Sequence, residues 1–345
     1  MKAAIFYGAG DIRIEERPVP RIGPGELLVK IMAAGICGSD LHAYRHSPKL
    51  LEGRMFGHEY SGEVVEVAKG VEGFSVGDRV GLEPLVGCGR CGYCASGSYH
   101  LCPSLWHVPG FAEYQKFPKS KAYKLPDHVS FEEASTLDCI AVAVHAAKLS
   151  GLRGGETAVV LGAGTIGLLT MQVLKAFGAK AVYETGTHDF QVELARELGA
   201  DAAINAKKED LVERIKILTG VEGAGGRETL RGVDHAFETV GGAKSALEEA
   251  LRIVRRGGTV TVIGDPKNPV MLSSFVMREV KVLGSSSYAY YGKEPEFKVA
   301  LDLLSSGKVN ARRIVTHAFP LERIKEAFDV ASDKGTGCVK VVVKP

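Results

Sequence analysis

The sequence predicts an α/β protein with two parts: a β-rich part and a doubly wound parallel sheet with helices on both faces. A chain of 345 residues is long enough for two domains. In the first third, short apolar runs are separated by glycine and proline, which is typical of strands joined by turns. From Thr157 onward, apolar strand-like runs alternate with helical patterns, which is typical of βαβ units.

The β-rich part is predicted from runs that are too short for helices and are bounded by turn residues. The predicted strands are Ala3–Tyr7, Leu27–Ile31, Gly62–Val67, Arg79–Leu82, a run beginning at Phe111, and Tyr123–Pro126. Ser130 and Glu133 have the spacing of a capping box, which predicts one helix running on to Leu149.

The second part begins with an apolar strand, Thr157–Leu161, that leads into a glycine-rich turn and then a helix over Leu168–Phe177. The turn has the pattern G-x-G-x-x-G, in which glycines let the backbone approach a pyrophosphate held at the helix N-terminus. Its predicted cofactor-binding residues are Gly162, Gly164, Thr165, Ile166 and Gly167.

The alternation continues to about residue 284. The predicted strands are Ala181–Glu184, Ala202–Ile204, Val233–Glu238 and Thr259–Ile263, and the predicted helices are Phe190–Leu198, Leu211–Leu218 and Ala243–Val254. Helices over Glu296–Ser305 and Leu321–Ser332 follow, and we expect a last strand, Cys338–Val343, to return to the N-terminal part. We therefore expect a first domain over 1–148, a dinucleotide-binding domain over 149–286, and a return to the first domain over 287–345.

Charge and hydropathy exclude several classes of partner. The formal net charge is +2, so no broad basic field favours nucleic acid or an anionic membrane. The longest apolar runs, such as Ala141–Ala147, are too short to span a bilayer, and the N-terminus lacks the pattern of a signal peptide. We expect a cytoplasmic protein with neither a nucleic-acid nor a membrane partner.

Four of the seven cysteines lie within fifteen residues. Cys88, Cys91, Cys94 and Cys102 follow the pattern C-x2-C-x2-C-x7-C, whose thiolates can close tetrahedrally on zinc. Four ligands leave no position for a substrate, so this zinc would be structural. Four free thiols so close together would oxidise; an iron–sulfur cluster is the alternative that uses the same ligands.

A second group of metal-ligand types lies in Gly35–His42 and Gly57–Glu59. Cys37 can bind a metal as thiolate, Ser39 can pass a proton, and His42 can accept one near neutral pH. Sixteen residues after His42 comes His58, which Glu59 follows directly. The competing interpretation is a buried thiol with polar surface neighbours.

In this order, these motifs resemble those of the zinc-containing medium-chain alcohol dehydrogenase superfamily, in particular its polyol, threonine and secondary-alcohol dehydrogenases. The match extends over essentially the whole chain and includes Gly77-Asp78-Arg79-Val80. The resemblance implies a GroES-like catalytic domain, a Rossmann domain, two zinc ions per chain and a homodimer or homotetramer.

The resemblance also implies roles for individual residues. The catalytic zinc would be held by Cys37, His58 and Asp138, with the adjacent Cys139 as the alternative third ligand. Glu59 would be a fourth ligand or a carboxylate that exchanges with water. Ser39 would take the substrate proton and His42 would carry it to solvent.

Cofactor choice depends on the end of the second strand of the parallel sheet. Relatives that use NAD place an aspartate there, where this chain has Gly186, followed by Thr187 and His188. The absence of a carboxylate at Gly186 removes repulsion of a 2′-phosphate, which favours NADP slightly over NAD. Two features favour NAD instead: Glu184 lies two residues earlier, and histidine is a weaker cation than arginine.

The substrate is expected to be a secondary alcohol, a polyol or a sugar hydroxyl. Sorbitol-type relatives carry an Arg-Tyr pair where this chain has Ser287 and Tyr288, which weakens the sorbitol assignment, and Trp106 and Tyr288 are candidate pocket residues. An L-threonine 3-dehydrogenase-like activity is an alternative. A non-catalytic binding protein with a zinc ribbon is an alternative of another class, which the near-zero net charge disfavours.

Overall fold

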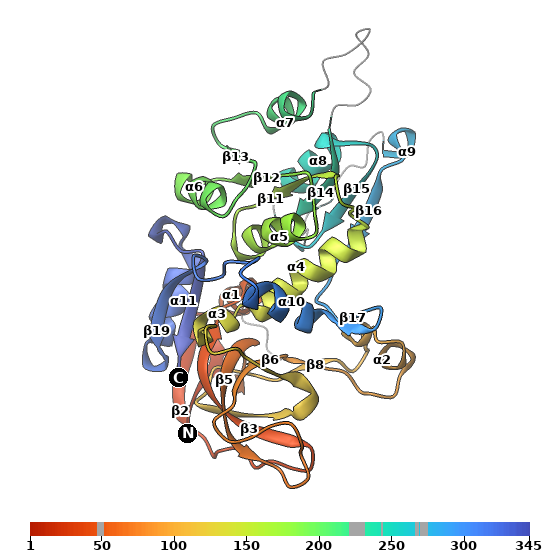
Figure 1. Ribbon diagram of the computed structural model, residues 1–345. Coiled ribbons are helices and arrows are strands. Elements are labelled where there is room, and N and C mark those ends of the chain that lie inside the picture. Colours follow the sequence, from red (N-terminus) through yellow and green to blue (C-terminus); the bar gives the residue numbers. More distant parts are fainter. Residues whose placement is uncertain (47–51, 221–231, 243, 266–268, 270–274) are drawn as a thin grey trace. The chain divides into compact units, whose positions relative to one another are not determined.

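The computed structural model describes residues 1–46, 52–220, 232–242, 244–265, 269 and 275–345 (Figure 1). These form two compact units. The first comprises Met1–Ala141, Ala289–Gly307 and Ala311–Pro345, and the second comprises Val142–Tyr288 and Lys308–Asn310. Each unit is described by itself.

The first unit is rich in β-structure, as predicted. Its strands are β1 (Lys2–Gly8), β2 (Asp11–Glu16), β3 (Glu26–Gly35), β4 (Arg54–Met55), β5 (Glu59–Val67), β6 (Arg79–Leu82), β7 (Leu85–Val86), β8 (Trp106–His107), β9 (Tyr114–Pro118), β10 (Ala122–Lys124), β17 (Tyr290–Tyr291), β18 (Glu294–Pro295), β19 (Val315–Pro320) and β20 (Lys340–Lys344).

The largest sheet of this unit has seven strands. Its order is β10-β6-β5-β3-β20-β19, and β9 also pairs with β3. Strand β20 runs antiparallel to β3 and parallel to β19, so the end of the chain does return to the N-terminal part. A smaller sheet has the order β2-β1-β4.

The helices of the first unit lie around these sheets. They are α1 (Gly38–His46), α2 (Gly92–Ala95), α3 (Phe131–Ala134), α10 (Glu296–Ser305) and α11 (Ile324–Ser332), with 3₁₀ helices at Tyr99–Leu101, Lys119–Lys121, Leu321–Arg323 and Lys334–Thr336. Helix α4 (Leu137–Ser150) begins in the first unit and ends in the second. The helix predicted over Leu321–Ser332 therefore starts as a 3₁₀ helix.

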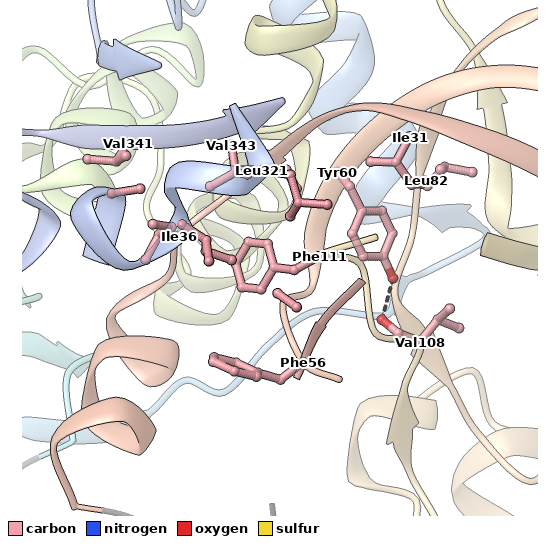
Figure 2. Close-up of a cluster of buried hydrophobic side chains, with 14 of the residues drawn as sticks. Ile31, Ile36, Phe56, Tyr60, Leu82, Val108, Phe111, Leu321, Val341 and Val343 are labelled. Atoms are coloured by element: carbon pink, nitrogen blue, oxygen red, sulfur yellow. Dashed lines mark hydrogen bonds between the residues drawn. The ribbon is translucent and has the colours of Figure 1, made fainter. Parts of the chain in front are cut away.

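The core of the first unit is built from aromatic and aliphatic side chains that strands far apart in sequence bring together. Figure 2 shows part of it, including Phe56, Phe111 and Val341. Tyr60 is almost fully buried, and its hydroxyl donates a hydrogen bond of 2.5 Å to the Val108 carbonyl. A buried hydroxyl needs such a partner, because an unpaired one costs about 1–3 kcal/mol.

The single helix predicted over 130–149 is wrong: two helices, α3 and α4, occupy this stretch. The predicted capping box at Ser130 and Glu133 is present. The Ser135 and Thr136 side chains, however, donate to the carbonyls of Glu132 and Glu133, three residues back. Such local bonds compete with the regular helical ladder and end α3 after one turn.

The second unit contains a six-stranded sheet in which every paired strand is parallel. Its order is β13-β12-β11-β14-β15-β16. The strands are β11 (Thr157–Leu161), β12 (Ala181–Gly186), β13 (Ala202–Asn205), β14 (Val233–Glu238), β15 (Val254–Val262) and β16 (Lys281–Gly284). The order outward in both directions from β11 is that of a doubly wound fold.

Helices cover both faces of this sheet. They are α5 (Thr165–Ala176), α6 (Asp189–Glu197), α7 (Leu211–Thr219), α8 (Lys244–Ile253) and α9 (Phe275–Arg278). Val159 and Tyr183 face α7 and α8, where they share a core with Ile215 and Ala250. Because side chains alternate along a strand, Val160 and Glu184 face the opposite side. Each predicted element of this series is found; Ala243, predicted to start a helix, lies outside the described residues.

Among the described residues, no helix is both long enough and apolar enough to cross a bilayer.

Candidate active site

Three metal-ligand types meet in the first unit. Ligand atoms of Cys37, His58 and Glu59 all lie within 4.8 Å of one another. Cys37 lies between β3 and α1, whereas Glu59 is the first residue of β5. Strands β3 and β5 are antiparallel neighbours with Gly35 opposite Glu59, so their register brings the two segments together.

The backbone at Gly57 explains why glycine precedes His58. Gly57 has φ of 90°, which L side chains rarely adopt. A Cβ atom there would lie 2.7 Å from the Phe111 ring. Glycine therefore lets the chain turn against the aromatic core and present His58 to Cys37.

Asp40, in the first turn of α1, lies beneath this cluster and is nearly fully buried. Its Oδ2 accepts a hydrogen bond of 2.9 Å from the Cys37 amide, and its Oδ1 lies 3.7 Å from His58 Nδ1. Burial lowers the pKa of His58, but Asp40 and Cys37 outweigh it and raise that pKa well above its usual value. The negative groups beside His58 thus stabilise a positive charge at this position, which can be a proton on the ring or a metal ion bound to the neutral imidazole.

Glu59 is fully buried, and one of its oxygens pairs with the Lys340 ammonium group. Lys340 is itself almost fully buried, and its Nζ donates a hydrogen bond of 3.0 Å to the Ile36 carbonyl. Burial alone would raise the pKa of Glu59, but Lys340 and His58 outweigh it and hold that pKa below its usual value. The other Glu59 oxygen accepts from Cys139 Sγ at 3.1 Å.

Asp138 and Cys139 occupy the start of α4. Asp138 lies outside the group of three ligands within 4.8 Å, although its carboxylate contributes to the raised pKa of His58. Burial is the main cause that raises the pKa of Cys139 well above its usual value, and the negative charge of Glu59 is the second. Ser39 and His42 are exposed on α1, and the His42 ring lies 4.3 Å from the His46 ring, centroid to centroid.

The four cysteines predicted to form a closed site do gather. The sulfur atoms of Cys88, Cys91, Cys94 and Cys102 all lie within 4.8 Å of one another. Cys88 Sγ is 4.0 Å from Cys94 Sγ, and Cys91 Sγ is 3.8 Å from Cys102 Sγ. Four sulfurs at 2.3 Å from a tetrahedral zinc ion stand about 3.8 Å apart, so the arrangement fits zinc.

A buried carboxylate attaches the four-cysteine loop to the large sheet. Glu83, which follows β6, accepts hydrogen bonds from Tyr99 in the loop, from Lys121 at 2.6 Å and from Tyr123 at 3.1 Å. Lys121 also lies 3.9 Å above the centre of the Tyr99 ring. The loop is thus held by a charged network that the cysteine spacing does not reveal.

In the second unit, the glycine-rich turn joins β11 to α5 as predicted. Gly164 is the N-cap of α5 and makes no side-chain cap, which is the arrangement in which a helix N-terminus can bind an anion. A Cβ atom on Gly167 would lie 1.9 Å from the Gly162 carbonyl oxygen, so only glycine permits this close approach.

Gly186, Thr187 and His188 form the end of β12 and the start of α6. The Gln191 side chain accepts hydrogen bonds of 3.2 Å from the Thr187 and His188 amides. A Cβ atom on Gly186 would lie 3.1 Å from the Cβ atom of Gln191, so a larger residue at position 186 would crowd the Gln191 side chain. Thr187 is exposed and His188 half-buried, and both side chains can reach a ligand.

Sequence reasoning missed four residues of these sites: Asp40, Glu83, Gln191 and Lys340. Gln191 could have been found as the third residue of a helix that begins after His188. Lys340 had a weaker signal, as a cation inside an apolar strand. Of the proposed pocket residues, Tyr288 is almost fully buried and Trp106 is about half exposed.

The donor sets fit the two metal ions that the sequence predicts. A thiolate, an imidazole and a carboxylate are the ligand types of catalytic zinc sites, and four thiolates are those of structural ones. Both groups gather in one unit, and the dinucleotide-type turn lies in the other.

Comparisons with known proteins agree with this geometry. Residues 23–127 match the alcohol dehydrogenase GroES-like domain, and residues 165–306 match the zinc-binding dehydrogenase family. Sorbitol dehydrogenase from Bacillus subtilis is 37% identical, over 100% of this chain and 97% of that protein.

Two crystal structures are similar along their whole length. A zinc-binding dehydrogenase from Sinorhizobium meliloti, bound to NADP, has a TM-score of 0.86 and 32% identity, over 100% of this chain and 99% of that chain. An alcohol dehydrogenase from Escherichia coli, in complex with NADH, has a TM-score of 0.88 and 29% identity, with the same coverage. The chain therefore belongs to the zinc-containing medium-chain alcohol dehydrogenase superfamily, and it is a zinc-dependent oxidoreductase of alcohols or polyols.

Proposed function

We propose that this protein oxidises a secondary hydroxyl group of a polyol or sugar alcohol to the ketone, with NADP used in preference to NAD. The observation that carries the proposal is the cluster of Cys37, His58 and Glu59, three different ligand types within 4.8 Å, in a unit that has a separate four-sulfur site. When bound, zinc supplies Lewis acidity that lowers the pKa of an alcohol, and the nicotinamide ring supplies the hydride acceptor.

Cys37 and His58 hold the catalytic metal in this proposal, with Asp138 as the third ligand. The hydrogen bond from Cys139 to Glu59 supports this choice, because it engages the competing thiol. Asp40 orients Cys37 and His58, and Lys340 holds the Glu59 carboxylate in place. Replacement of Asp138 by Asn should lower the zinc content, whereas Cys139→Ser should leave it unchanged; the reverse result would assign the ligand to Cys139.

The hydroxyl proton of the substrate leaves through the exposed face of α1. Ser39 accepts it, and His42, three residues along the same helix, passes it to solvent. The exposure of both side chains supports this route.

The dinucleotide binds to the second unit. Gly162 and Gly164 shape the turn, since their own amides donate to the Thr185 and Gly162 carbonyls, and the backbone amides of Thr165, Ile166 and Gly167 hold the diphosphate. Thr187 and His188 donate to the 2′-phosphate of NADP. The crowding of Gly186 by Gln191 supports this assignment, because it disfavours the aspartate that would bind the ribose of NAD.

A panel of secondary alcohols, polyols, sugar alcohols and L-threonine, each with NADP and with NAD, tests the proposal. We expect the highest kcat/KM for a polyol or sugar alcohol with NADP, and no activity in Cys37→Ser. A preference for L-threonine would favour an amino-alcohol dehydrogenase, and a large preference for NAD would contradict the cofactor assignment.

We also propose a homodimer or homotetramer, as the family resemblance suggests. Sedimentation velocity on the holoenzyme distinguishes these two states from a monomer.

A further inference from the structure

Glu184 is a buried carboxyl group that the proposed mechanism does not use. It lies on β12, two residues before Gly186, and its relative exposure is 0%. Among the described residues, neither of its carboxylate oxygens has a hydrogen-bond partner. An unpaired buried charge is unfavourable, so burial favours the protonated form of this group.

The position of Glu184 is beneath the dinucleotide-type turn. A Cβ atom built on Gly167 would lie 3.0 Å from Glu184 Oε1 and 1.9 Å from the Gly162 carbonyl oxygen. Gly162 opens the turn and Gly167 lies in the first turn of α5. The carboxyl group therefore reaches the floor of the turn, on the side away from the core that Val159 shares with α7 and α8.

Among the residues that the structure describes, no charged group offsets the effect of burial on Glu184. Val160 of β11 and Ala203 of β13 are the strand neighbours of Glu184. The titratable side chains on the packed helices are Lys175 on α5 and Asp189, Glu193, Arg196 and Glu197 on α6. Burial is the one cause that raises the pKa of Glu184 well above its usual value, so none of these groups offsets it.

A negative charge on Glu184 would act where an anion binds. The amides at the N-terminus of α5 carry partial positive charge, and the diphosphate of a dinucleotide is attracted to it. An ionised carboxylate on the floor of the turn would neutralise part of that field and repel the diphosphate through a poorly solvated region.

We propose that Glu184 is a positioning residue for the dinucleotide: its neutral form holds the floor of the turn uncharged, and its ionised form weakens diphosphate binding. This inference rests on the proposed function, in which the turn binds the diphosphate of NADP.

The proposal predicts how affinity changes with pH. If the ionised form binds much more weakly, the dissociation constant rises about tenfold per pH unit above the point at which Glu184 ionises in the free protein. ADP-ribose is the suitable probe, because it carries the diphosphate but has neither the nicotinamide ring nor the 2′-phosphate that the proposed function assigns to Thr187 and His188. Adenosine is the control probe without a diphosphate.

The experiment measures ADP-ribose and adenosine binding by calorimetry between pH 6 and 10, with zinc-loaded wild type, Glu184→Gln, Glu184→Leu and Thr170→Val. Thr170 is a matched control, since it lies on α5 three residues after Gly167 and has a fully buried hydroxyl without a partner among the described residues. We expect ADP-ribose affinity to fall with pH in wild type and Thr170→Val and to stay level in both Glu184 variants.

Equal pH profiles in wild type and the Glu184 variants would overturn the role of Glu184 while leaving the dinucleotide site intact. The same fall for adenosine would also overturn it, because the effect would not act through the diphosphate. Failure of ADP-ribose to bind any of the proteins at any pH would instead overturn the dinucleotide site of the proposed function.

Discussion

Lys340 and Glu59 show how strongly one buried pair constrains the metal-ligand cluster. Both side chains are almost fully buried, and each provides the countercharge of the other. Such a pair adds little net stability compared with apolar residues of the same size, but removal of one member leaves an uncompensated charge. The pair therefore fixes the position of Glu59 beside Cys37 and His58.

Replacement of Lys340 by Met should lower the free energy of unfolding by about 3–5 kcal/mol, because it leaves the buried Glu59 carboxylate without a countercharge. Denaturant unfolding of the zinc-loaded protein measures this loss. Lys340→Arg keeps the charge and should lose much less, and Lys340→Met combined with Glu59→Gln should recover part of the stability. A loss of under about 1 kcal/mol in Lys340→Met would show that Glu59 is neutral in the native protein.

At the scale of single elements, local patterns predicted the structure well where each element carries its own signal. The βαβ series has apolar strands and amphipathic helices, and each was found. Strand β19 gave no signal because it has no fully buried face and alternates between half-buried and exposed residues. The split between α3 and α4 was missed because it depends on side-chain hydrogen bonds of Ser135 and Thr136.

The residues of the candidate sites also differ in how well the sequence predicts them. The cysteine loop and the glycine-rich turn are compact in sequence, so their residues could be identified before the structure was known. Lys340 is noticeable as a cation in an apolar strand, but its contact with Glu59 could not be predicted, because that contact depends on the pairing of β20 with β3 across almost the whole chain. Glu83 is hidden for the same reason, since its partners come from the loop, from the 3₁₀ helix Lys119–Lys121 and from β10.

Helix α3 offers a test of its cap. Ser130→Ala removes the hydroxyl that accepts from the Glu133 amide at 3.2 Å, and we expect a loss of about 1 kcal/mol in unfolding free energy. Urea unfolding measures it. Ser130→Thr keeps the hydroxyl and should retain most of the stability; equal losses in both variants would mean that the cap does not stabilise the helix.

The cysteine loop offers a second test. If the chain binds the two zinc ions that the sequence predicts, Cys94→Ser should reduce the zinc content to about one ion per chain, because three thiolates bind the structural ion less tightly. We expect the Tm to fall by roughly 5 °C or more, given about 2–4 °C per kcal/mol for domains of 150–250 residues. Metal analysis and calorimetry provide the readouts. An unchanged zinc content would contradict a closed four-thiolate site.

For the molecule as a whole, Glu184 links stability to pH. Its pKa is raised in the folded state, so the folded protein keeps a proton that the unfolded chain releases above about pH 4.5. Stability is therefore lost as pH rises from the unfolded pKa towards the folded one, by up to about 1.4 kcal/mol per pH unit. Unfolding free energies of wild type minus Glu184→Gln, compared at pH 5, 7 and 9, isolate this contribution. A constant difference would show that Glu184 ionises normally.

The chain order of the strands has a consequence for biosynthesis. Strand β20 is made last, yet it lies between β3 and β19 in the large sheet and carries the counter-ion of Glu59. On the ribosome, the intervening segment Val142–Tyr288 can form its parallel sheet while the first unit still lacks a central strand. The nascent protein therefore acquires the complete surroundings of Cys37, His58 and Glu59 only after translation of β20, so we expect the proposed metal to bind that centre after β20 has joined the sheet.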